Sequence, residues 1–380
     1  MKIALVGPTY PFRGGIAHYT TRLHQALVDE GHDLLTVTFR RQYPAWLFPG
    51  SSDRDASRHT LPLPDAKPWL DSLNPLTWQR TARALAAAAP DLLVLQWWTT
   101  FWAAIWVTLA RRVRDTGATR VVFLCHNVLP HDAKPWERRI SRWVLAHGDG
   151  WVVHTEAERA RLVTLLPGCA PQVAAHPLYD IFPTTPLPQA EARRQLGLPV
   201  DGPLLLFFGM VRAYKGLDDL LAALPAVLAA QPGARLLVAG DFWGQYPAYA
   251  CRVAELGLEY AVTLHNRYIP NEEVATYFAA ADALVAPYRR ATGSGVVQTA
   301  TALGTPVIGS DAVLDALSAG EHGRVVPACD PAALAAALID FLQTPRLRLQ
   351  TAQTAATVAA SWRTLIGALM AAAGAAEPRP

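Results

Sequence analysis

Two basic residues, Arg212 and Lys215, stand in a short turn between a predicted strand and a predicted helix. The strand is the bulky apolar run 204–208, and the helix is the apolar-periodic segment 217–228. A helix N-terminus offers free N–H groups and a partial positive charge, so two neighbouring cations would complete a site for phosphate. An ordinary turn with a solvated Arg and Lys is the alternative. The turn is neither a Gly-Lys-Ser/Thr Walker loop nor a GxGxxG dinucleotide fingerprint.

Small residues ahead of helix 295–303 predict a second anion site in the same half of the chain. Ser294, Gly295 and Val296 open this helix, which follows the predicted strand 283–286. Small residues allow a phosphate group to reach the N–H groups at a helix N-terminus. Two anion sites and two cations together fit a diphosphate.

The N-terminal half offers a further set of candidates, each directly after a predicted strand. Gly14 and Gly15 follow the first strand, and glycines let a backbone approach a phosphate or a sugar closely. His126 stands at the carboxyl end of a strand, where a histidine in an α/β fold is favoured as a site residue. His154 and His176 have similar positions with weaker claims. A plain loop and structural histidines are the alternatives.

The elements that must position these residues alternate as strand and helix along both halves of the chain. This alternation predicts an α/β fold with two parallel, doubly wound sheets, and 380 residues suit two domains. The Pro-dense segment 177–188 marks the boundary, which gives domains 1–180 and 181–345 and a C-terminal helical segment 346–380. Residues 41–78 are predicted to be a long irregular excursion. Ligands are expected in a cleft between the domains, at the carboxyl ends of the strands.

One segment, 92–110, lacks charged residues and approaches the length of a membrane span. Polar residues divide it, so we expect a short buried strand over 92–96 followed by a helix over 100–116 rather than a span. The segment also carries a cluster of four tryptophans, which we assign to the core or a pocket wall, with a surface for a greasy substrate as the alternative. The cluster is Trp97, Trp98, Trp102 and Trp106.

Composition favours a well-packed globular protein, because 51% of the residues are hydrophobic and only 17% are charged. The first 175 residues hold 20 Lys and Arg against 14 Asp and Glu, which indicates an anionic partner such as a membrane surface, or else solvated helix faces. The four cysteines form no CxxC pair, which disfavours metal sites and disulfides and fits a reducing cytoplasm. The chain runs from Met1 almost directly into the first strand, so no signal peptide is expected.

Seven stretches, taken in order along nearly the whole chain, resemble a family 4 glycosyltransferase. They are GG at 14–15, HN at 126–127, VVHTEAERARL at 152–162, HPLYD at 176–180, FFGMVRAYKGLDDLLAA at 207–223, ADALVAPY at 281–288 and ALGTPVI at 302–308. The resemblance implies a GT-B architecture of two Rossmann-like domains, with an NDP-sugar bound mainly by the C-terminal domain and the acceptor mainly by the N-terminal one. It also implies transfer with retention, no metal requirement, and a C-terminal helix that returns to the first domain.

The resemblance also implies roles for individual residues. Arg212 and Lys215 match the pair that holds the donor diphosphate and stabilises the leaving group, and His126 matches a histidine near the reacting sugar. The expected catalytic residues are His126, Arg212 and Lys215. The expected donor-binding residues are Gly14, Gly15, Gly209, Arg212, Lys215, Tyr268, Ile269, Ser294, Gly295, Val296 and Thr299.

One departure from the family pattern concerns two positions, eight residues apart, where the family usually has glutamates. The first of those glutamates lies at the donor sugar and the second at the nucleotide ribose. Ala291 and Thr299 stand at those positions, and neither carries a charge. The Ser-Gly-Val loop at 294–296 resembles a version found in part of the family, so loss of activity does not follow. Gln298 and Thr299 are candidates to hold the ribose in place of a glutamate.

The sequence therefore predicts a retaining, metal-independent glycosyltransferase that moves a sugar from an NDP-sugar to a glycan or a lipid-linked saccharide. Asp53-Arg54-Asp55 reads formally as a metal-binding DxD motif, but it lies in a loop far from the phosphate site and is attributed to chance. A cytoplasmic location is expected, with peripheral association at the inner membrane face and no nucleic-acid partner. The alternative is a non-catalytic nucleotide-sugar-binding protein or partner subunit on the same fold. A nicotinamide-dependent dehydrogenase is disfavoured, because no GxGxxG follows a strand.

Overall fold

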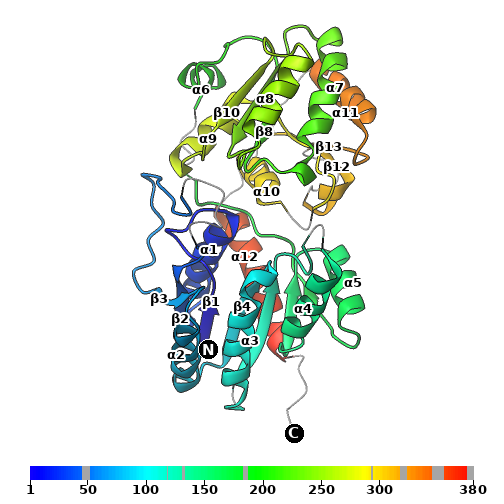
Figure 1. Cartoon of the computed structure of the whole chain (residues 1–380). Helices are drawn as coiled ribbons and strands as arrows, with labels where there is room; N and C mark the ends of the chain where they lie inside the picture. Colours follow the sequence, from blue (N-terminus) through cyan, green and yellow to red (C-terminus); the bar gives the residue numbers. More distant parts are fainter. Residues whose placement is uncertain are drawn as a thin grey trace. The chain divides into compact units, whose positions relative to one another are not determined.

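The computed structural model describes residues 1–44, 52–117, 119–130, 133–182, 187–291, 294–316, 323–344 and 355–374. The chain forms two compact units (Figure 1). The first contains Met1–Asp55, Thr60–Pro177 and Ala359–Pro380, and the second contains Ala56–His59 and Leu178–Val358. Each unit is a parallel sheet with interspersed helices, so the predicted fold class is confirmed.

The first unit is built on a seven-stranded parallel sheet with the order β3-β2-β1-β4-β5-β6-β7. Its strands are β1 (Lys2–Val6), β2 (Asp33–Arg41), β3 (Lys67–Asp71), β4 (Leu92–Trp97), β5 (Arg120–Cys125), β6 (Gly150–Val153) and β7 (Gln172–Val173). All six residues of β4 are buried, as are the last five of β5. Central strands of a parallel sheet are covered on both faces, which is why they read as continuous apolar runs in the sequence.

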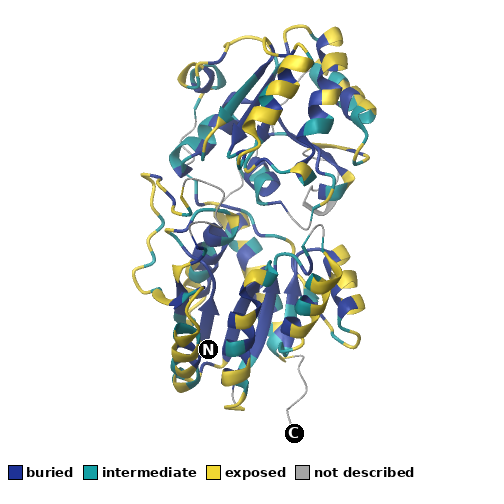
Figure 2. Ribbon diagram, in the orientation of Figure 1, coloured by how far each residue is buried: buried dark blue, intermediate teal, exposed yellow. Residues whose placement is uncertain are grey.

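Helices cover both faces of this sheet. They are α1 (Gly15–Asp29), α2 (Pro75–Ala88), the 3₁₀ turn η1 (Thr100–Trp102), α3 (Ala103–Arg114), α4 (Pro135–Leu145), α5 (Glu156–Leu165) and most of α12 (Ala355–Gly374). Helices α2, α3 and α4 lie side by side on one face, and α12 lies with the helices of this unit although it comes from the other end of the chain (Figure 1). Figure 2 shows the strands buried and the outer helix faces exposed.

Helix α12 is long and apolar enough to cross a membrane by length and composition alone. Its large apolar side chains are nevertheless buried in the protein, among them Trp362, Leu365 and Leu369. Its backbone also touches the sheet: a methyl group added to Gly150 in β6 would lie 2.2 Å from the carbonyl oxygen of Ala372. The helix therefore buries one apolar face against the first unit, the pattern of an amphipathic packing helix.

The second unit is built on a six-stranded parallel sheet with the order β10-β9-β8-β11-β12-β13. Its strands are β8 (Leu204–Phe208), β9 (Arg235–Gly240), β10 (Val262–Asn266), β11 (Ala283–Ala286), β12 (Val307–Ser310) and β13 (Gly323–Val326). Its helices are α6 (Gln189–Gln195), the 3₁₀ turn η2 (Ala213–Lys215), α7 (Leu217–Ala230), α8 (Tyr246–Glu255), α9 (Asn271–Ala280), α10 (Gly295–Ala302), the 3₁₀ turn η3 (Asp311–Ala316) and α11 (Pro331–Gln343).

Both sheets share the strand order of the Rossmann fold. Numbering the strands within each unit, six of them follow the order 3-2-1-4-5-6 in the first sheet and all six do so in the second. In such sheets the order reverses between strands 1 and 4, and ligands bind beyond the carboxyl ends of the strands at that point. The reversal lies between β1 and β4 in one unit and between β8 and β11 in the other. The site candidates follow these strands and their neighbours.

The predicted excursion over 41–78 was only partly correct. It contains β3, which pairs in parallel with the edge of the sheet and has a single buried residue, Leu70. A short edge strand with a proline and one buried side chain gives no apolar run to recognise. The excursion also reaches the second unit, where the Glu272 carboxylate accepts the backbone N–H groups of Arg58 (3.0 Å) and His59 (3.3 Å).

Other expected elements differ in detail. The short strand β7 and the seven-residue polar helix α6 were not predicted, because neither offers a run of apolar residues. The helix expected over 312–318 is a 3₁₀ turn as far as Ala316, and its last two residues lie outside the described part of the chain. Residues 346–354 of the expected C-terminal segment also lie outside it. The interpretation of 92–110 as a strand followed by a helix is confirmed by β4 and α3.

Candidate active site

Lys215 occupies the end of η2, beyond the carboxyl end of β8, and is only 7% exposed. Its ammonium lies 5.4 Å from the ring centre of Tyr288, which follows β11. Burial is the main cause that lowers the pKa of this ammonium. Within the described part of the chain no carboxylate pairs with it. The described part of the unit therefore buries a positive charge beside an aromatic ring and supplies no counter-ion for it.

Arg212 is held in a similar way three residues earlier. Its guanidinium carbon lies 3.8 Å from the ring centre of Trp243, in the loop after β9. Trp243 has a φ of 47°, which is unusual for a bulky residue, and its N–H donates to Oδ1 of Asp241 (3.0 Å). Stacking covers one face of the planar guanidinium and leaves its edge N–H groups available to oxygen acceptors. No ion pair joins Arg212 to the residues that the structure describes.

Neighbouring arginines behave differently, and the contrast identifies the unpaired charges as a feature of the site. Arg289 donates two hydrogen bonds of 2.8 Å to the carboxylate of Asp219. Arg267, after β10, pairs with Glu273. These two cations are neutralised and anchor loops. Arg212 and Lys215, by contrast, form no ion pair with the residues that the structure describes.

Two glycines allow the turn to take this shape. Gly209 has a φ of +91°, and a methyl group added to it would lie 3.2 Å from Lys215 Nζ and 3.2 Å from Cγ2 of Val296. The space beside Gly209 therefore borders both the Lys215 ammonium and the first turn of α10. Gly216 has a φ of +73°, and a methyl group there would lie 2.0 Å from the carbonyl oxygen of Pro287. Only glycine permits this approach between η2 and the segment after β11.

The N-terminus of α10 lies across the space beside Gly209 from Lys215. Ser294 caps the helix by accepting the N–H of Val297 (3.2 Å). Within the described residues, the N–H groups of Gly295 and Val296 donate to no partner. Tyr179 packs against this end, since its ring would lie 3.0 Å from a methyl group on Gly295. The predicted anion site at this helix thus has free donors close to Lys215.

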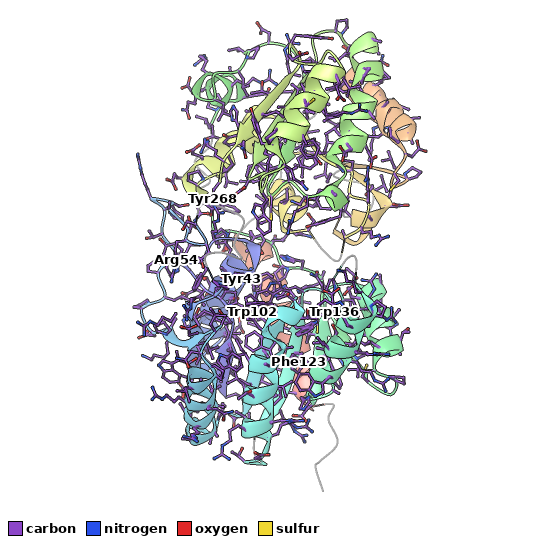
Figure 3. The ribbon with its side chains drawn as sticks, viewed as in Figure 1. Tyr43, Arg54, Trp102, Phe123, Trp136 and Tyr268 are labelled. Atoms are coloured by element: carbon purple, nitrogen blue, oxygen red, sulfur yellow. The ribbon has the colours of Figure 1, made fainter. Side chains whose placement is uncertain are left out.

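The remaining donor-site candidates of this unit are placed less directly. Thr299 is buried, and its hydroxyl donates to the carbonyl oxygen of Gly295 (2.8 Å), one helical turn earlier. Ile269 belongs to the apolar core. Tyr268, labelled in Figure 3, stands beside it and is half-buried. Both follow β10, two strands away from β8 in the sheet. No described contact joins them to Arg212 or Lys215.

In the first unit, Gly14 and Gly15 open α1 in the loop that follows β1. Methyl groups on either glycine would meet no atom within 4 Å, so the space beside both is open. Residues 53–55 brace the loop: the guanidinium of Arg54 lies 4.1 Å from the ring centre of Phe12. Asp55 is buried against His18 (3.3 Å). The formal DxD motif therefore has a structural role in this loop.

His126, at the end of β5, belongs to an aromatic cluster around Tyr19 of α1. Tyr19 lies 4.7 Å from His126, 5.5 Å from His154 and 5.1 Å from His176, measured between ring centres. Nε2 of His126 donates to the side-chain oxygen of Gln96 (2.7 Å), which leaves Nδ1 as an acceptor. The three histidines that were separate candidates in the sequence are therefore brought together.

Burial keeps these three imidazoles neutral. It lowers the pKa of His126 well below the usual value, and the neighbouring histidines lower it further. It lowers the pKa of His154 to about 4 and that of His176 to about 3. At neutral pH the cluster can accept or donate hydrogen bonds but carries no charge. Among the described residues no group of three or more His, Cys, Asp or Glu side chains is arranged to hold a metal ion.

Two family models match the chain in succession. The model described as "Glycosyl transferase 4-like domain" matches residues 14–179, and the one described as "Glycosyl transferases group 1" matches residues 202–344. The chain belongs to the group 1 glycosyltransferases. The family resemblance seen in the sequence is thereby confirmed.

Relatives of this glycosyltransferase chain include D-inositol 3-phosphate glycosyltransferases. The one from Thermobispora bispora is 32% identical over 208 residues, which cover 52% of this chain and 48% of the relative. The one from Saccharomonospora viridis is 30% identical over 243 residues, covering 60% and 56%. The chain thus spans about half the length of these curated relatives.

Solved structures of similar fold cover nearly the whole chain. Sucrose-phosphate synthase from Thermosynechococcus elongatus superimposes with a TM-score of 0.69 at 21% identity, over 98% of this chain and 94% of that one. Anabaena HepE in complex with UDP-glucose gives a TM-score of 0.68 at 17% identity, over 98% of both chains. These likenesses show the GT-B fold.

Several residues of the site were not predicted from the sequence. Trp243 and Tyr288 hold the two cations, Tyr179 packs on α10, and Tyr19 and Gln96 organise His126. Tyr179 and Tyr288 lie within the family-like stretches at 176–180 and 281–288, which was a usable signal. Trp243 carries no such signal, because its role depends on a backbone conformation that the sequence does not specify.

Proposed function

We propose that this chain is a retaining glycosyltransferase that moves a sugar from an NDP-sugar to a glycan or lipid-linked saccharide acceptor. The observation that carries the proposal is the pair of cations, Arg212 and Lys215, which stand on aromatic rings and have no carboxylate partner among the described residues. A diphosphate is the ligand that such a pair fits, because it supplies the missing negative charge and accepts the forked N–H groups of arginine. Membership of the group 1 glycosyltransferases supports the same reading.

In the proposed reaction the bond between the sugar and the diphosphate breaks, and negative charge develops on the leaving diphosphate. Lys215 and Arg212 stabilise that charge. The free N–H groups at the start of α10 add to the positive electrostatic potential at the diphosphate. Because these groups are already held in place and partly desolvated, little reorganisation is needed as the charge forms. In this proposal the two cations neutralise the leaving group, the task that a divalent ion performs in metal-dependent transferases.

His126 is the residue that we assign to the transferred sugar. Its imidazole is neutral, and its Nε2–H is occupied by Gln96, so Nδ1 is available to accept a hydrogen bond from a sugar hydroxyl. Gly14 and Gly15 offer open space where a methyl group would otherwise stand beside the ligand. These features support assigning the sugar end of the donor, and the acceptor, to the loops of the first unit.

The donor base and the acceptor are proposed only by class. HepE contains UDP-glucose in its structure, which makes UDP-sugars the first donors to test. D-inositol 3-phosphate, the acceptor named for the curated relatives, is one acceptor to include. We propose a cytoplasmic location, where NDP-sugars are available, and the four free cysteines are compatible with it.

A non-catalytic nucleotide-sugar-binding protein is the second candidate, and one observation favours it. The family glutamates are replaced by Ala291 and Thr299, and the Thr299 hydroxyl donates to its own helix. Neither residue supplies a carboxylate to the sugar or the ribose. Turnover of a donor decides between the two candidates.

The test is donor hydrolysis and binding with UDP-, GDP-, ADP- and dTDP-sugars, comparing wild type with Lys215→Met. Arg252→Gln is the matched control, since Arg252 is an exposed cation of the same unit that pairs with Glu255. Hydrolysis of one donor that is lost in Lys215→Met and kept in the control supports the transferase. Binding without turnover supports the second candidate. No binding to any donor would overturn both. Retention is tested separately, from the anomeric configuration of the product by NMR.

A further inference from the structure

Helix α4 (Pro135–Leu145) has an outer face that the proposed reaction does not explain. Its inner face is buried through Ser141, Val144 and Leu145, which pack on the first unit. The outer face carries Trp136 and Trp143, whose side chains are large and apolar yet 51% and 45% exposed. Figure 3 labels Trp136 on this helix. Two half-exposed tryptophans on one short helix are unusual for a surface that faces only water.

The spacing of these residues places them in one stripe. Trp136 and Trp143 are seven positions apart, so they lie on the same side of the helix two turns apart. Arg139 stands between them, three positions after Trp136 and four before Trp143. Arg142 lies next to Arg139 around the helix. The exposed face is therefore an alternating stripe of indoles and guanidinium groups.

The arginines of this face are available to an external anion. Arg138, Arg139 and Arg142 are exposed, and none forms an ion pair with another described residue. The one carboxylate of the helix, Glu137, is occupied in accepting the backbone N–H of Lys134 at 2.8 Å. By contrast, Arg114 of the basic run on α3 pairs with Asp149 and is directed inward. Helix α4 thus presents three exposed arginines on the face that carries its two tryptophans.

We propose that this face of α4 docks the protein on an anionic lipid bilayer. Tryptophan side chains prefer the headgroup level of a membrane, and arginines beside them are attracted to anionic headgroups. A second copy of the chain fits this face less well, because a symmetric contact would set these three arginines against the same arginines of the other copy. The helix would lie in the plane of the interface with Trp136 and Trp143 inserted.

The proposal goes beyond the proposed function, since it rests on α4 alone. If both hold, docking would place the first unit beside lipid-linked acceptors and would favour these over soluble saccharides. The two can fail independently, because vesicle binding needs no donor and donor hydrolysis needs no vesicle.

The experiment is cosedimentation of the full chain with vesicles of phosphatidylcholine containing about a third phosphatidylglycerol, and with pure phosphatidylcholine vesicles. Arg139→Gln/Arg142→Gln is the test variant, and Arg80→Gln/Arg83→Gln on exposed positions of α2 is the control with the same charge change. Each surface arginine strengthens binding by about fivefold, so the α4 variant should bind roughly 25-fold more weakly, and the control less than twofold. Trp136→Ala/Trp143→Ala should also lose binding, while all variants keep wild-type donor hydrolysis in solution.

Several results would overturn the proposal. Equal binding to charged and uncharged vesicles would refute recognition of anionic lipid, and equal weakening by the α2 control would show that net charge rather than α4 is responsible. A wild-type chain that does not sediment with anionic vesicles at about 0.1 M salt, or one that forms a dimer lost in Trp136→Ala/Trp143→Ala, would assign this face to something other than a membrane.

Discussion

Replacing Lys215 with Met should abolish most donor turnover while leaving the fold intact or more stable. The substitution keeps an unbranched side chain of similar length and removes only the charge. Removing one preorganised group that stabilises a developing negative charge costs about 2.7–4 kcal/mol, or roughly 10²–10³-fold in kcat. Since Lys215 would bind the diphosphate in the ground state as well, the affinity for the free nucleoside diphosphate should also fall.

The effect on stability has the opposite sign. Lys215 is 7% exposed and has no carboxylate partner in the described part of the chain, so folding removes its charge from water without compensation by an ion pair. The cation–π attraction to the ring of Tyr288, 5.4 Å away, stabilises the ammonium by on the order of 0.5–1 kcal/mol. This is less than the several kcal/mol that burying an ion costs. We therefore expect Lys215→Met to raise the free energy of unfolding by about 1 kcal/mol, and the midpoint temperature of the second unit by roughly 2–4 °C.

The assay combines donor hydrolysis with calorimetry on the same preparations. Arg252→Gln is the reference for loss of a cation that already has a carboxylate partner. A loss of activity together with a lower melting temperature would mean that Lys215 is a structural residue whose removal disturbs η2. Activity within tenfold of wild type in a stably folded variant would refute the leaving-group role altogether.

Three further predictions concern other parts of the structure. Trp243→Ala should lower kcat/KM by about 5–30-fold and Trp243→Phe by much less, because the aromatic ring positions Arg212, which steady-state kinetics would reveal. Since burial lowers the pKa of His154 to about 4, the unfolded chain binds the proton more tightly than the folded one. Stability should therefore fall by about 3 kcal/mol on this account as the pH drops from 6.5 to 4, and His154→Asn should flatten that slope in urea unfolding. Gly216→Ala should destabilise the second unit by roughly 2–4 kcal/mol because its methyl group meets a carbonyl oxygen at 2.0 Å, whereas Gly233→Ala, with nothing within 4 Å, should be nearly neutral by the same measurement.

The fold could be predicted from the sequence because parallel sheets are buried on both faces. Runs such as Leu204–Phe208 and Ala283–Ala286 are apolar throughout, and the alternating helices fix the sheet as parallel. The prediction was wrong where this physical signal is absent. Strand β3 buries only Leu70, and its pairing with β2 depends on register rather than on composition.

The site could be predicted only to the level of loops. The rule that ligands bind beyond the carboxyl ends of strands selects the segments after β1, β5, β8 and β11, and the glycines and basic residues within them were identified. The contacts that give those residues their chemistry are formed between segments far apart in sequence. Tyr19 gathers histidines from three later elements, and the sequence indicates each histidine but not their assembly.

The way in which the two cations are held determines what they can do. A carboxylate partner would fix an arginine or lysine equally well, as Asp219 fixes Arg289, but it would also cancel the charge. An aromatic ring fixes the cation through its face and leaves most of the charge uncompensated. In the function proposed here, Trp243 and Tyr288 thus keep Arg212 and Lys215 in position for an anion that is not part of the protein. An added carboxylate within reach of Lys215, for example Val296→Glu, should consequently weaken nucleoside diphosphate binding even where it stabilises the free protein.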